Sequence, residues 1–319
     1  MYIYRTAGVF SQTDVIRYIM KKQFILFFLT CLCCHLTKGQ VEDSIKLKNA
    51  TLYYSLYGNG KPILLLSGGP GASAFMLEPI ANSLSNDYQC ILFEQRGTGK
   101  SRTNPFDSTT INLKQAAEDI DILRKKLSIS KLTILGHSWG AMLAMYYTIN
   151  YPDAVEKLIL VAPGGLGSGK THATDNRTAR ATIEEREATR KAQDSINKNI
   201  ATPETIIANR KRFLRLNIYD AYKADSLFPI LAKGGSLNIK MSQLMMMDVT
   251  KHYDVREGFR KLKIPTLVIC GIQDPLIFPV FEIMELNKNA IIQWIEKSGH
   301  YPFVEQPQAF YQAVTKFLR

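Results

Sequence analysis

The segment LTILGHSWGAMLA, residues 132–144, joins an apolar run, a G-x-S-x-G pentapeptide and a second apolar run. This pattern predicts a strand, a tight turn and a helix. Gly136 and Gly140 flank the turn and let strand and helix approach without a Cβ between them. The turn would lift the Ser138 hydroxyl above the sheet, and the Trp139 N–H at the helix start would favour negative charge on a reacting oxygen. Ser138 is therefore a candidate nucleophile and Trp139 a candidate oxyanion-hole donor.

Strand-like and helix-like runs alternate along most of the remaining chain. Unbroken apolar runs, which suit parallel strands covered on both faces, recur on either side of the serine segment. They are residues 62–66, 90–93, 157–162, 265–270 and 290–295. Helical patterns separate several of them, and residues 51–57 form a further strand that we expect at the edge of the sheet. The alternation predicts an α/β fold with a mostly parallel, doubly wound sheet.

A long stretch in the second half of the chain breaks this alternation. Residues 164–257 are polar and helix-prone and contain no strong strand run. We therefore expect an α/β core made of residues 45–163 and 258–319, with residues 164–257 inserted as a helical cap. The Met-rich run 244–247 lies in this cap, where its methionines could pack in the cap core or line an apolar pocket.

Two further candidates stand just after predicted strands, at the edge where open α/β sheets bind their ligands: Asp274 and His300. A serine hydroxyl needs a base within hydrogen-bond reach, and the base needs a third group that fixes its tautomer. The chain order Ser138, Asp274, His300 is the order of an α/β-hydrolase triad. Glu282 and Glu285 are the alternatives to Asp274.

A glycine-rich loop, residues 67–71, follows the apolar run 62–66 and can bring its backbone close to a ligand. Gly69 is the candidate for the second oxyanion donor, because Pro70 has no N–H. The turn at residues 94–101 is also rich in glycine and polar groups. Its glycines lack the spacing of a phosphate-binding loop and no helical pattern follows directly, so we exclude that function.

Composition and charge exclude several classes of protein. The chain has 319 residues, of which 46% are hydrophobic and 21% charged, which is typical of a globular protein. Residues 1–39 hold +4 of the net charge of +12, and the remaining basic residues are spread among acids without a basic, aromatic stripe, so no nucleic-acid partner is expected. Cys90 and Cys270 lie in apolar runs and are expected to be buried thiols, and no metal-binding cluster is apparent.

The amino terminus has the pattern of a targeting signal. Met20 and two lysines precede the apolar run 24–34, and Gly39 lies near a possible cleavage point. We interpret residues 1–19 as an upstream extension and residues 20–39 as a signal peptide, so the protein would be exported, periplasmic or secreted, without stable membrane insertion. The run is too short to span a bilayer as a helix. A short membrane anchor or a lipoprotein signal is the alternative.

From about residue 52 to 319, the chain resembles the prolyl iminopeptidase-like group of α/β-hydrolase serine peptidases. The resemblance is carried by residues 68–71, 94–101, 136–140, 265–268 with Asp274, and 299–300. It implies a hydrolase that needs no cofactor and has a helical cap, and that removes an amino-terminal residue, often proline, from short peptides. The chain departs from the group at Ser67, Glu94 and His137, where the usual residues are histidine, aspartate and glycine.

Members of this group bind the substrate ammonium with glutamates of the cap. Near the expected place this chain offers only Gln243 and Asp248, and Glu204 is another cap acid. Asp248 and, second, Glu204 are therefore the candidate substrate-binding residues. The competing hypothesis is a carboxylester hydrolase that uses the same triad and contacts an apolar acyl chain through Met245–Met247, and a third is a non-catalytic binding protein on the hydrolase fold. The partner in the enzyme cases is a small peptide or a small acyl substrate.

Overall fold

The predicted strand at the start of the serine segment is β6 (Leu132–His137), which lies near the middle of a nine-stranded sheet. The computed structural model describes residues 40–167 and 172–319. The strand order is β1-β2-β4-β3-β6-β7-β8-β9, and β5 pairs with β2. The parallel strands are β3 (Lys61–Leu66), β4 (Tyr88–Phe93), β6, β7 (Val155–Val161), β8 (Thr266–Gly271) and β9 (Ile291–Ile295).

The other end of the sheet is antiparallel and differs from the expected arrangement. The strand expected at the edge is β2 (Ala50–Tyr57), but β1 (Val41–Lys46) pairs outside it, and the short β5 (Arg102–Thr103) also joins it. The expectation of an edge strand was therefore wrong. β1 was missed because its residues are mostly polar and exposed and show no apolar alternation.

Both faces of the sheet are covered, which accounts for the unbroken apolar strands. Alternate residues of β3 belong to different clusters: Leu64 and Leu66 pack on one face, Ile63 and Leu65 on the other. The first face meets α3 (Leu113–Lys126), α4 (Trp139–Asn150), α10 (Arg256–Arg260) and α11 (Phe278–Leu286). The second face meets η1 (Ala74–Leu77), α2 (Glu78–Leu84), α12 (Pro302–Glu305) and α13 (Pro307–Leu318).

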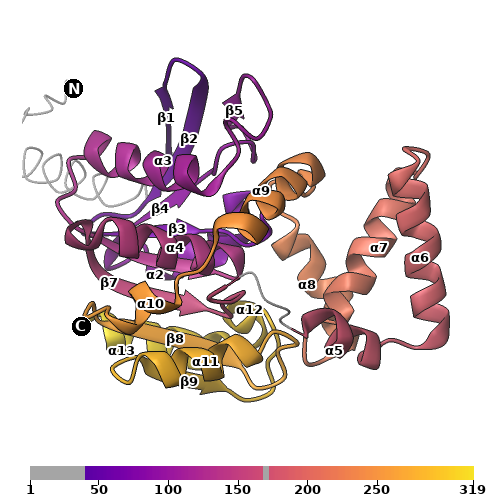
Figure 1. The fold of residues 1–319 in the computed structure, drawn as a ribbon. Coiled ribbons are helices and arrows are strands. Elements are labelled where there is room, and N and C mark those ends of the chain that lie inside the picture. Colours follow the sequence, from indigo (N-terminus) through magenta and orange to yellow (C-terminus); the bar gives the residue numbers. More distant parts are fainter. Residues whose placement is uncertain (1–39, 168–171) are drawn as a thin grey trace, which may run out of the picture. The chain divides into compact units, whose positions relative to one another are not determined.

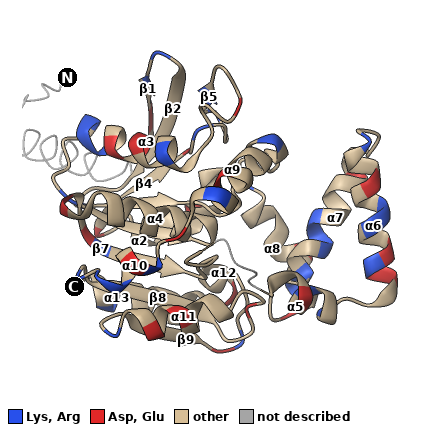
Figure 2. Cartoon of the chain, in the orientation of Figure 1, with Lys and Arg blue, Asp and Glu red and all other residues tan. Residues whose placement is uncertain are grey.

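Between β7 and β8 the described chain, residues 172–252, is a helical insertion (Figure 1). It contains α5 (Ala173–Arg180), α6 (Ile183–Asn197), α7 (Pro203–Arg215), η3 (Ala221–Lys223), α8 (Ala224–Leu231) and α9 (Ile239–His252). α6 and α7 form an antiparallel hairpin with many charged residues (Figure 2). α9 instead packs on α3, and its Met241 and Met245 belong to the sheet core. The Met-rich run thus supplies core packing at Met245, whereas Met246 and Met247 are exposed.

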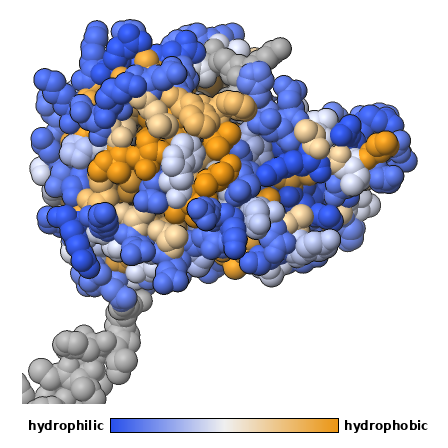
Figure 3. Space-filling view, turned by 90° about the horizontal axis from the view of Figure 1, so that it is seen from below, coloured by the Kyte–Doolittle hydropathy of each residue, from blue (hydrophilic) through white to orange (hydrophobic). Residues whose placement is uncertain are grey.

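Residues 40–319 form one compact unit. The expectations for residues 1–19 and 20–39 lie outside the described residues. Among the helices of the described ranges, none has the length and apolar character needed to cross a membrane. Figure 3 shows an apolar area on the side of β9 and α11, where Phe278, Phe281 and Ile291 are exposed.

Candidate active site

Ser138 occupies a strained turn between β6 and α4. Its φ is +56° and its ψ −114°, a conformation that a residue with a side chain rarely adopts and that a structure must hold in place. The Ser138 N–H donates to the carbonyl of Val161 at 2.9 Å, which ties the turn to β7. A Cβ on Gly136 would collide with the Gly140 carbonyl, and a Cβ on Gly140 with the Leu66 carbonyl. The turn predicted from the sequence therefore exists, and it needs both glycines.

His300 and Asp274, predicted from separate strand ends, meet in the structure. The Nδ1 atom of His300 lies 2.9 Å from Oδ2 and 3.1 Å from Oδ1 of Asp274, and both side chains are buried. Burial works to raise the pKa of Asp274, but the charge and hydrogen bond of His300 and the Leu276 N–H hold it below its usual value. An ionised Asp274 that accepts Nδ1–H leaves Nε2 of His300 free to act as a base.

The loop that carries His300 is held beside the serine turn by His137. Nε2 of His137 lies 2.9 Å from the His300 carbonyl, to which it can donate, and the two rings are 4.9 Å apart. Burial, and after it the charge of His300, lowers the pKa of His137 to about 3, so the ring is neutral at pH 7. His137 therefore joins two candidate catalytic residues that are distant in sequence. The sequence identified position 137 only as a departure from related peptidases.

The glycine-rich loop after β3 lies against the serine turn. A Cβ on Gly68 would stand 3.1 Å from the Cβ of Ser138, and Gly69 has a φ of +123°. Gln95 links this loop to the start of α4. Its Nε2 donates to the Ser67 carbonyl at 3.1 Å, and its Oε1 accepts the Trp139 indole N–H at 2.9 Å. The two expected oxyanion donors, Gly69 and Trp139, thus belong to segments that meet at Ser138.

Glu94, just after β4, binds the segment that follows this loop. Its buried carboxylate accepts the Ser73 hydroxyl at 2.5 Å, the Ala74 N–H at 3.0 Å and the Thr98 hydroxyl at 2.9 Å. Its backbone carbonyl accepts the Ser101 hydroxyl at 2.7 Å. The polar turn at residues 94–101 is therefore internal support for the loop.

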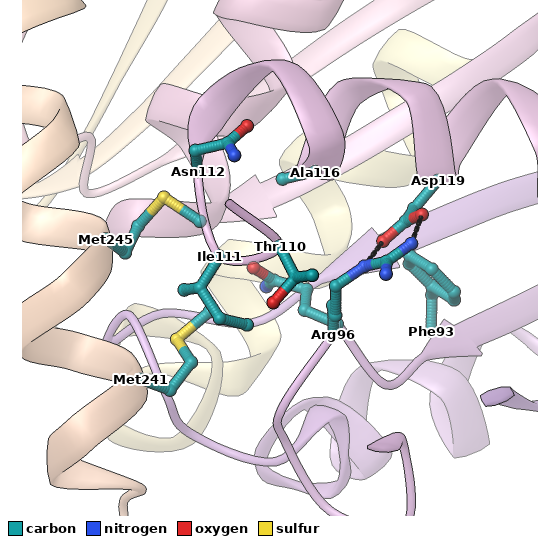
Figure 4. A pocket seen from close by; sticks show the side chains of 10 residues that line it. Phe93, Arg96, Thr110, Ile111, Asn112, Ala116, Asp119, Met241 and Met245 are labelled. Carbon is teal, nitrogen blue, oxygen red and sulfur yellow. Dashed lines mark hydrogen bonds and ion pairs between the residues drawn. The ribbon is translucent and has the colours of Figure 1, made fainter. Parts of the chain in front are cut away.

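The turn also carries Arg96, whose charge is neutralised inside the protein. Its guanidinium binds both oxygens of Asp119, at 2.9 and 2.6 Å, and the pair is buried (Figure 4). The cavity beside the pair has a volume of about 10 Å³, room for about one water molecule, and Met241 and Met245 close it on one side. This part of the turn leaves no charge or space for a phosphate group.

The family follows from comparison with known proteins. A family model described as the alpha/beta hydrolase fold matches residues 61–307. The chain belongs to the α/β-hydrolase fold family.

Proteins similar to this hydrolase include ones named as peptidases and one named as an esterase. It is 25% identical over 281 residues to a proline iminopeptidase of Heyndrickxia coagulans, covering 82% of this chain and 91% of the other. The structure of proline iminopeptidase from Mycobacterium smegmatis has a TM-score of 0.69 at 18% identity, covering 87% and 97% of the two chains. An esterase from Exiguobacterium antarcticum has a TM-score of 0.65 at 20% identity, covering 84% and 95%. The two structural likenesses show the fold.

The two acids predicted to bind substrate lie in different surroundings in the hydrolase. One carboxylate oxygen of Asp248 accepts the Leu113 N–H at 2.9 Å at the start of α3, and the other lies 2.9 Å from Nδ1 of His252. Glu204 is exposed in the first turn of α7, next to the loop at the far end of the α6–α7 hairpin (Figure 1). Both carboxylate oxygens of Asp248 therefore already have partners within the protein. An ammonium site at either acid stays a prediction.

A second acid that contacts the histidine loop of the hydrolase, besides Asp274, is Glu305, which the sequence did not single out. It accepts backbone N–H groups from Gly299 at 3.0 Å, Tyr301 at 3.1 Å and Tyr219 at 2.7 Å. Burial raises the pKa of Glu305, against the lowering effect of these hydrogen bonds. Glu305 thus supports the loop on both sides of His300 and ties it to the helical insertion. No residue spacing signals this role, because it depends on the path of two loops.

The described part of the hydrolase also shows how its potential metal ligands and its two free thiols are placed. In residues 40–167 and 172–319 no three His, Cys, Asp or Glu side chains are grouped so that they could hold a metal ion. Cys90 and Cys270 are free and buried, as the apolar runs around them predicted. Burial raises the pKa of both thiols, which opposes formation of a thiolate.

Proposed function

We propose that this protein is a serine hydrolase with Ser138 as nucleophile, His300 as general base and Asp274 as the group that orients His300. The observation that carries the proposal is the strained Ser138 turn beside a histidine whose Nδ1 is bound to a buried carboxylate. A fluorophosphonate probe tests it. The probe should label Ser138 in the purified protein and should not label a Ser138→Ala variant. Absence of labelling in the native protein would favour a non-catalytic binding protein.

In the proposed reaction, His300 removes the hydroxyl proton of Ser138 as its oxygen attacks the substrate carbonyl carbon. The N–H groups of Gly69 and Trp139 bind the oxygen that becomes negative. The bond to the leaving group then breaks, and His300 gives its proton to that group. Water, activated by the same histidine, attacks the acyl-enzyme, releases the acid and restores Ser138.

For the substrate, we propose an aminopeptidase of the prolyl iminopeptidase type that releases the amino-terminal residue of short peptides. The curated relatives named proline iminopeptidase support this class. The helical insertion would act as the cap, because its segment before α9 binds the glycine-rich loop 67–71, here called the oxyanion loop: the Asn238 N–H donates to the Gly71 carbonyl at 2.9 Å. A free-amine proline arylamide compared with its acetylated form tests the proposal. Only the free amine should be hydrolysed.

The acid that would bind the substrate ammonium can be tested in the same assay. Removing one charge-assisted contact should lower kcat/KM by roughly one to two powers of ten. Asp248→Asn and Glu204→Gln are the variants to compare, in that order of preference. Because Asp248 also binds the start of α3, its variant needs a melting-temperature control, so that loss of stability is not mistaken for loss of recognition.

The second candidate function is a carboxylester hydrolase. The structural likeness to an esterase and the engagement of Asp248 within the protein favour it. An ester substrate needs no ammonium site, and the exposed Met246 and Met247 would offer apolar contact to an acyl chain. Brisk hydrolysis of a butyrate ester, with equal or no turnover of the two proline arylamides, would support this function and exclude the peptidase.

We also propose that the protein is exported and that the mature chain begins near Gln40. The charged and apolar pattern of residues 20–39 supports this. Amino-terminal sequencing of the protein recovered outside the cytoplasm tests the proposal. A cytoplasmic protein that retains Met1 or Met20 would contradict it.

A further inference from the structure

Arg177 of α5 contacts Asn217, a residue that holds the histidine loop. Its Nε donates to Oδ1 of Asn217 at 2.9 Å, and its guanidinium lies over the Phe213 ring, 4.8 Å from the centroid. The backbone carbonyl of the same Asn217 accepts the His300 N–H at 2.7 Å. One residue therefore binds both the arginine side chain and the backbone of the candidate base.

Arg210 of α7 approaches from the side of the oxyanion loop. Its guanidinium donates to the Gly235 carbonyl at 3.3 Å and to the Ser236 hydroxyl at 3.4 Å. The next residue, Leu237, has its side chain beside Gly69: a Cβ on Gly69 would stand 3.4 Å from it. Arg210 is therefore hydrogen-bonded to residues 235–236, the segment that leads directly to the Leu237 contact with Gly69.

Both arginines act on Tyr301, the residue after His300. Burial raises the pKa of Tyr301 to about 12, and the charges of Arg177 and Arg210 oppose that rise. The Tyr301 ring is 5.2 Å from the His300 ring. The two arginines thus approach the site from two helices, Arg177 of α5 beside the histidine loop and Arg210 of α7 beside the segment that contacts Gly69; the basic residues of both helices are visible in Figure 2.

Neither arginine has an acidic partner among the described residues. Other cations of the insertion form ion pairs, such as Lys211 with Asp225 and Arg215 with Glu185, but none joins Arg177 or Arg210 to a carboxylate in residues 40–167 and 172–319. The two nearby acids are already engaged, Asp274 by His300 and Glu305 by three backbone N–H groups. Both arginines are half-buried, so their charges are partly removed from water, and this burial lowers the pKa of each. A partly buried, unpaired cation favours an anionic ligand.

We propose that Arg177 and Arg210 bind a carboxylate on the leaving group of the substrate, so that the preferred substrates are short and end in a free carboxylate, as a dipeptide does. This rests on the proposed function, in which His300 gives its proton to the leaving group. The leaving group must therefore lie near His300, on the side of Arg177, while Arg210 approaches from the segment beside Gly69. A peptide that continues past the next residue would carry its carboxylate beyond their reach.

The test compares substrates that differ only in this charge. The native protein should hydrolyse prolyl-alanine with a kcat/KM about ten- to a hundredfold higher than prolyl-alanine amide, the range expected for one charge-assisted contact. Arg177→Gln and Arg210→Gln should each reduce the value for the dipeptide by at least about tenfold and leave the amide within about threefold. Arg190→Gln is the matched control, because Arg190 is exposed on α6 and pairs with Asp194. It should leave both values unchanged.

A structural role for Arg177, acting through Asn217 on His300, predicts a different result. Both substrates would then lose activity by the same factor in Arg177→Gln, and that outcome would overturn the proposal. Partial recovery of the dipeptide preference in Arg177→Lys would support it, because lysine keeps the charge without the bond geometry.

A second pair of substrates separates this inference from the peptidase hypothesis. Esters of one acyl group, butyrate, with 4-hydroxybenzoate or with neutral 4-hydroxybenzamide differ in the charge of the leaving group alone. If the protein hydrolyses neither peptide but prefers the 4-hydroxybenzoate ester, and Arg177→Gln removes that preference, the peptidase proposal fails and the carboxylate site stands. If neither pair shows a preference for the carboxylate, the proposed site is wrong, whatever the activity toward peptides.

Discussion

The backbone carbonyl of Asn217 accepts the His300 N–H at 2.7 Å, and so joins the helical insertion directly to the candidate base. Asn217 is completely buried, and its side chain also binds Arg177 and the Phe213 carbonyl. A Cβ on Gly299 would collide with the Asn217 carbonyl, so glycine before the histidine allows this close approach. The insertion therefore takes part in positioning the site as well as in enclosing it.

The triad assignment predicts losses that do not add. Ser138→Ala and His300→Ala should each lower kcat by several powers of ten, and the double variant should be little worse, because the two residues act in the same step. Asp274→Asn should also be severe, since the amide cannot stabilise the His300 cation. Steady-state kinetics on the best substrate check this, with circular dichroism to show that each variant is folded. Losses that multiply in the double variant would contradict the shared role.

Glu94→Ala should damage both stability and turnover. The change leaves the Ala74 N–H and the Ser73 hydroxyl without their acceptor in a buried place, and each such group costs about 1–3 kcal/mol, whereas the Thr98 hydroxyl keeps the Gln95 carbonyl as acceptor. The free energy of unfolding from urea titration should fall accordingly, and kcat should fall more than KM changes, since the Gly69 loop loses its support. Glu118→Ala, on the surface of α3, is the control and should leave both quantities nearly unchanged. Unaltered kcat in folded Glu94→Ala would show that the loop does not depend on this carboxylate.

Gly140→Ala should be far more destabilising than a change at an open glycine. Its Cβ would meet the backbone carbonyl of Leu66 in a central strand, and neither group can move without disturbing the sheet. We expect a loss of at least about 3 kcal/mol in the free energy of unfolding, or no folded protein. Gly235→Ala provides the comparison: it has no neighbour within 4 Å but a φ of +102°, so it should cost only about 1–2 kcal/mol. Similar losses at the two sites would contradict the packing argument.

His137 should make the protein less stable as the pH falls. Its pKa in the folded protein is about 3, below its ordinary value of 6.5, so between these values the unfolded chain binds the extra proton. Stability then rises with pH across this window and is lost as the pH falls through it, by about 1.4 kcal/mol per unit at most. Urea titrations at pH 7, 6, 5 and 4 should show a shallower dependence in His137→Gln, by roughly 3 kcal/mol over the range. Parallel curves for the two proteins would exclude the contribution of His137.

The sequence was sufficient to predict the parts of the fold that depend on local pattern. The apolar strands, the Ser138 turn and the chain order of Asp274 and His300 follow from periodicity and from the needs of a nucleophile. The antiparallel β1 could not be predicted, because a polar edge strand is stabilised by its pairing with β2 and not by its own side chains.

The supports of the site were beyond the reach of sequence reasoning for a different reason. Glu305, Asn217 and His137 act through backbone groups on other loops, and such contacts depend on the three-dimensional path of the chain. Asp248 has a contact that the sequence did not indicate, and its contact with a substrate stays a prediction. Its place in the insertion suggested a substrate contact, and the structure engages it at the start of α3.

The helical insertion is fastened to both sides of the candidate active site, by Asn217 to the histidine loop and by Asn238 to the Gly71 carbonyl. Any motion large enough to lift it away from Ser138 would break one or both of these bonds. The protein would then be unable to hold its donors and its base in register while it is open to solvent. The protein would then admit a substrate in one conformation and react with it in another. In the open conformation Ser138 would have little capacity to attack molecules other than the substrate.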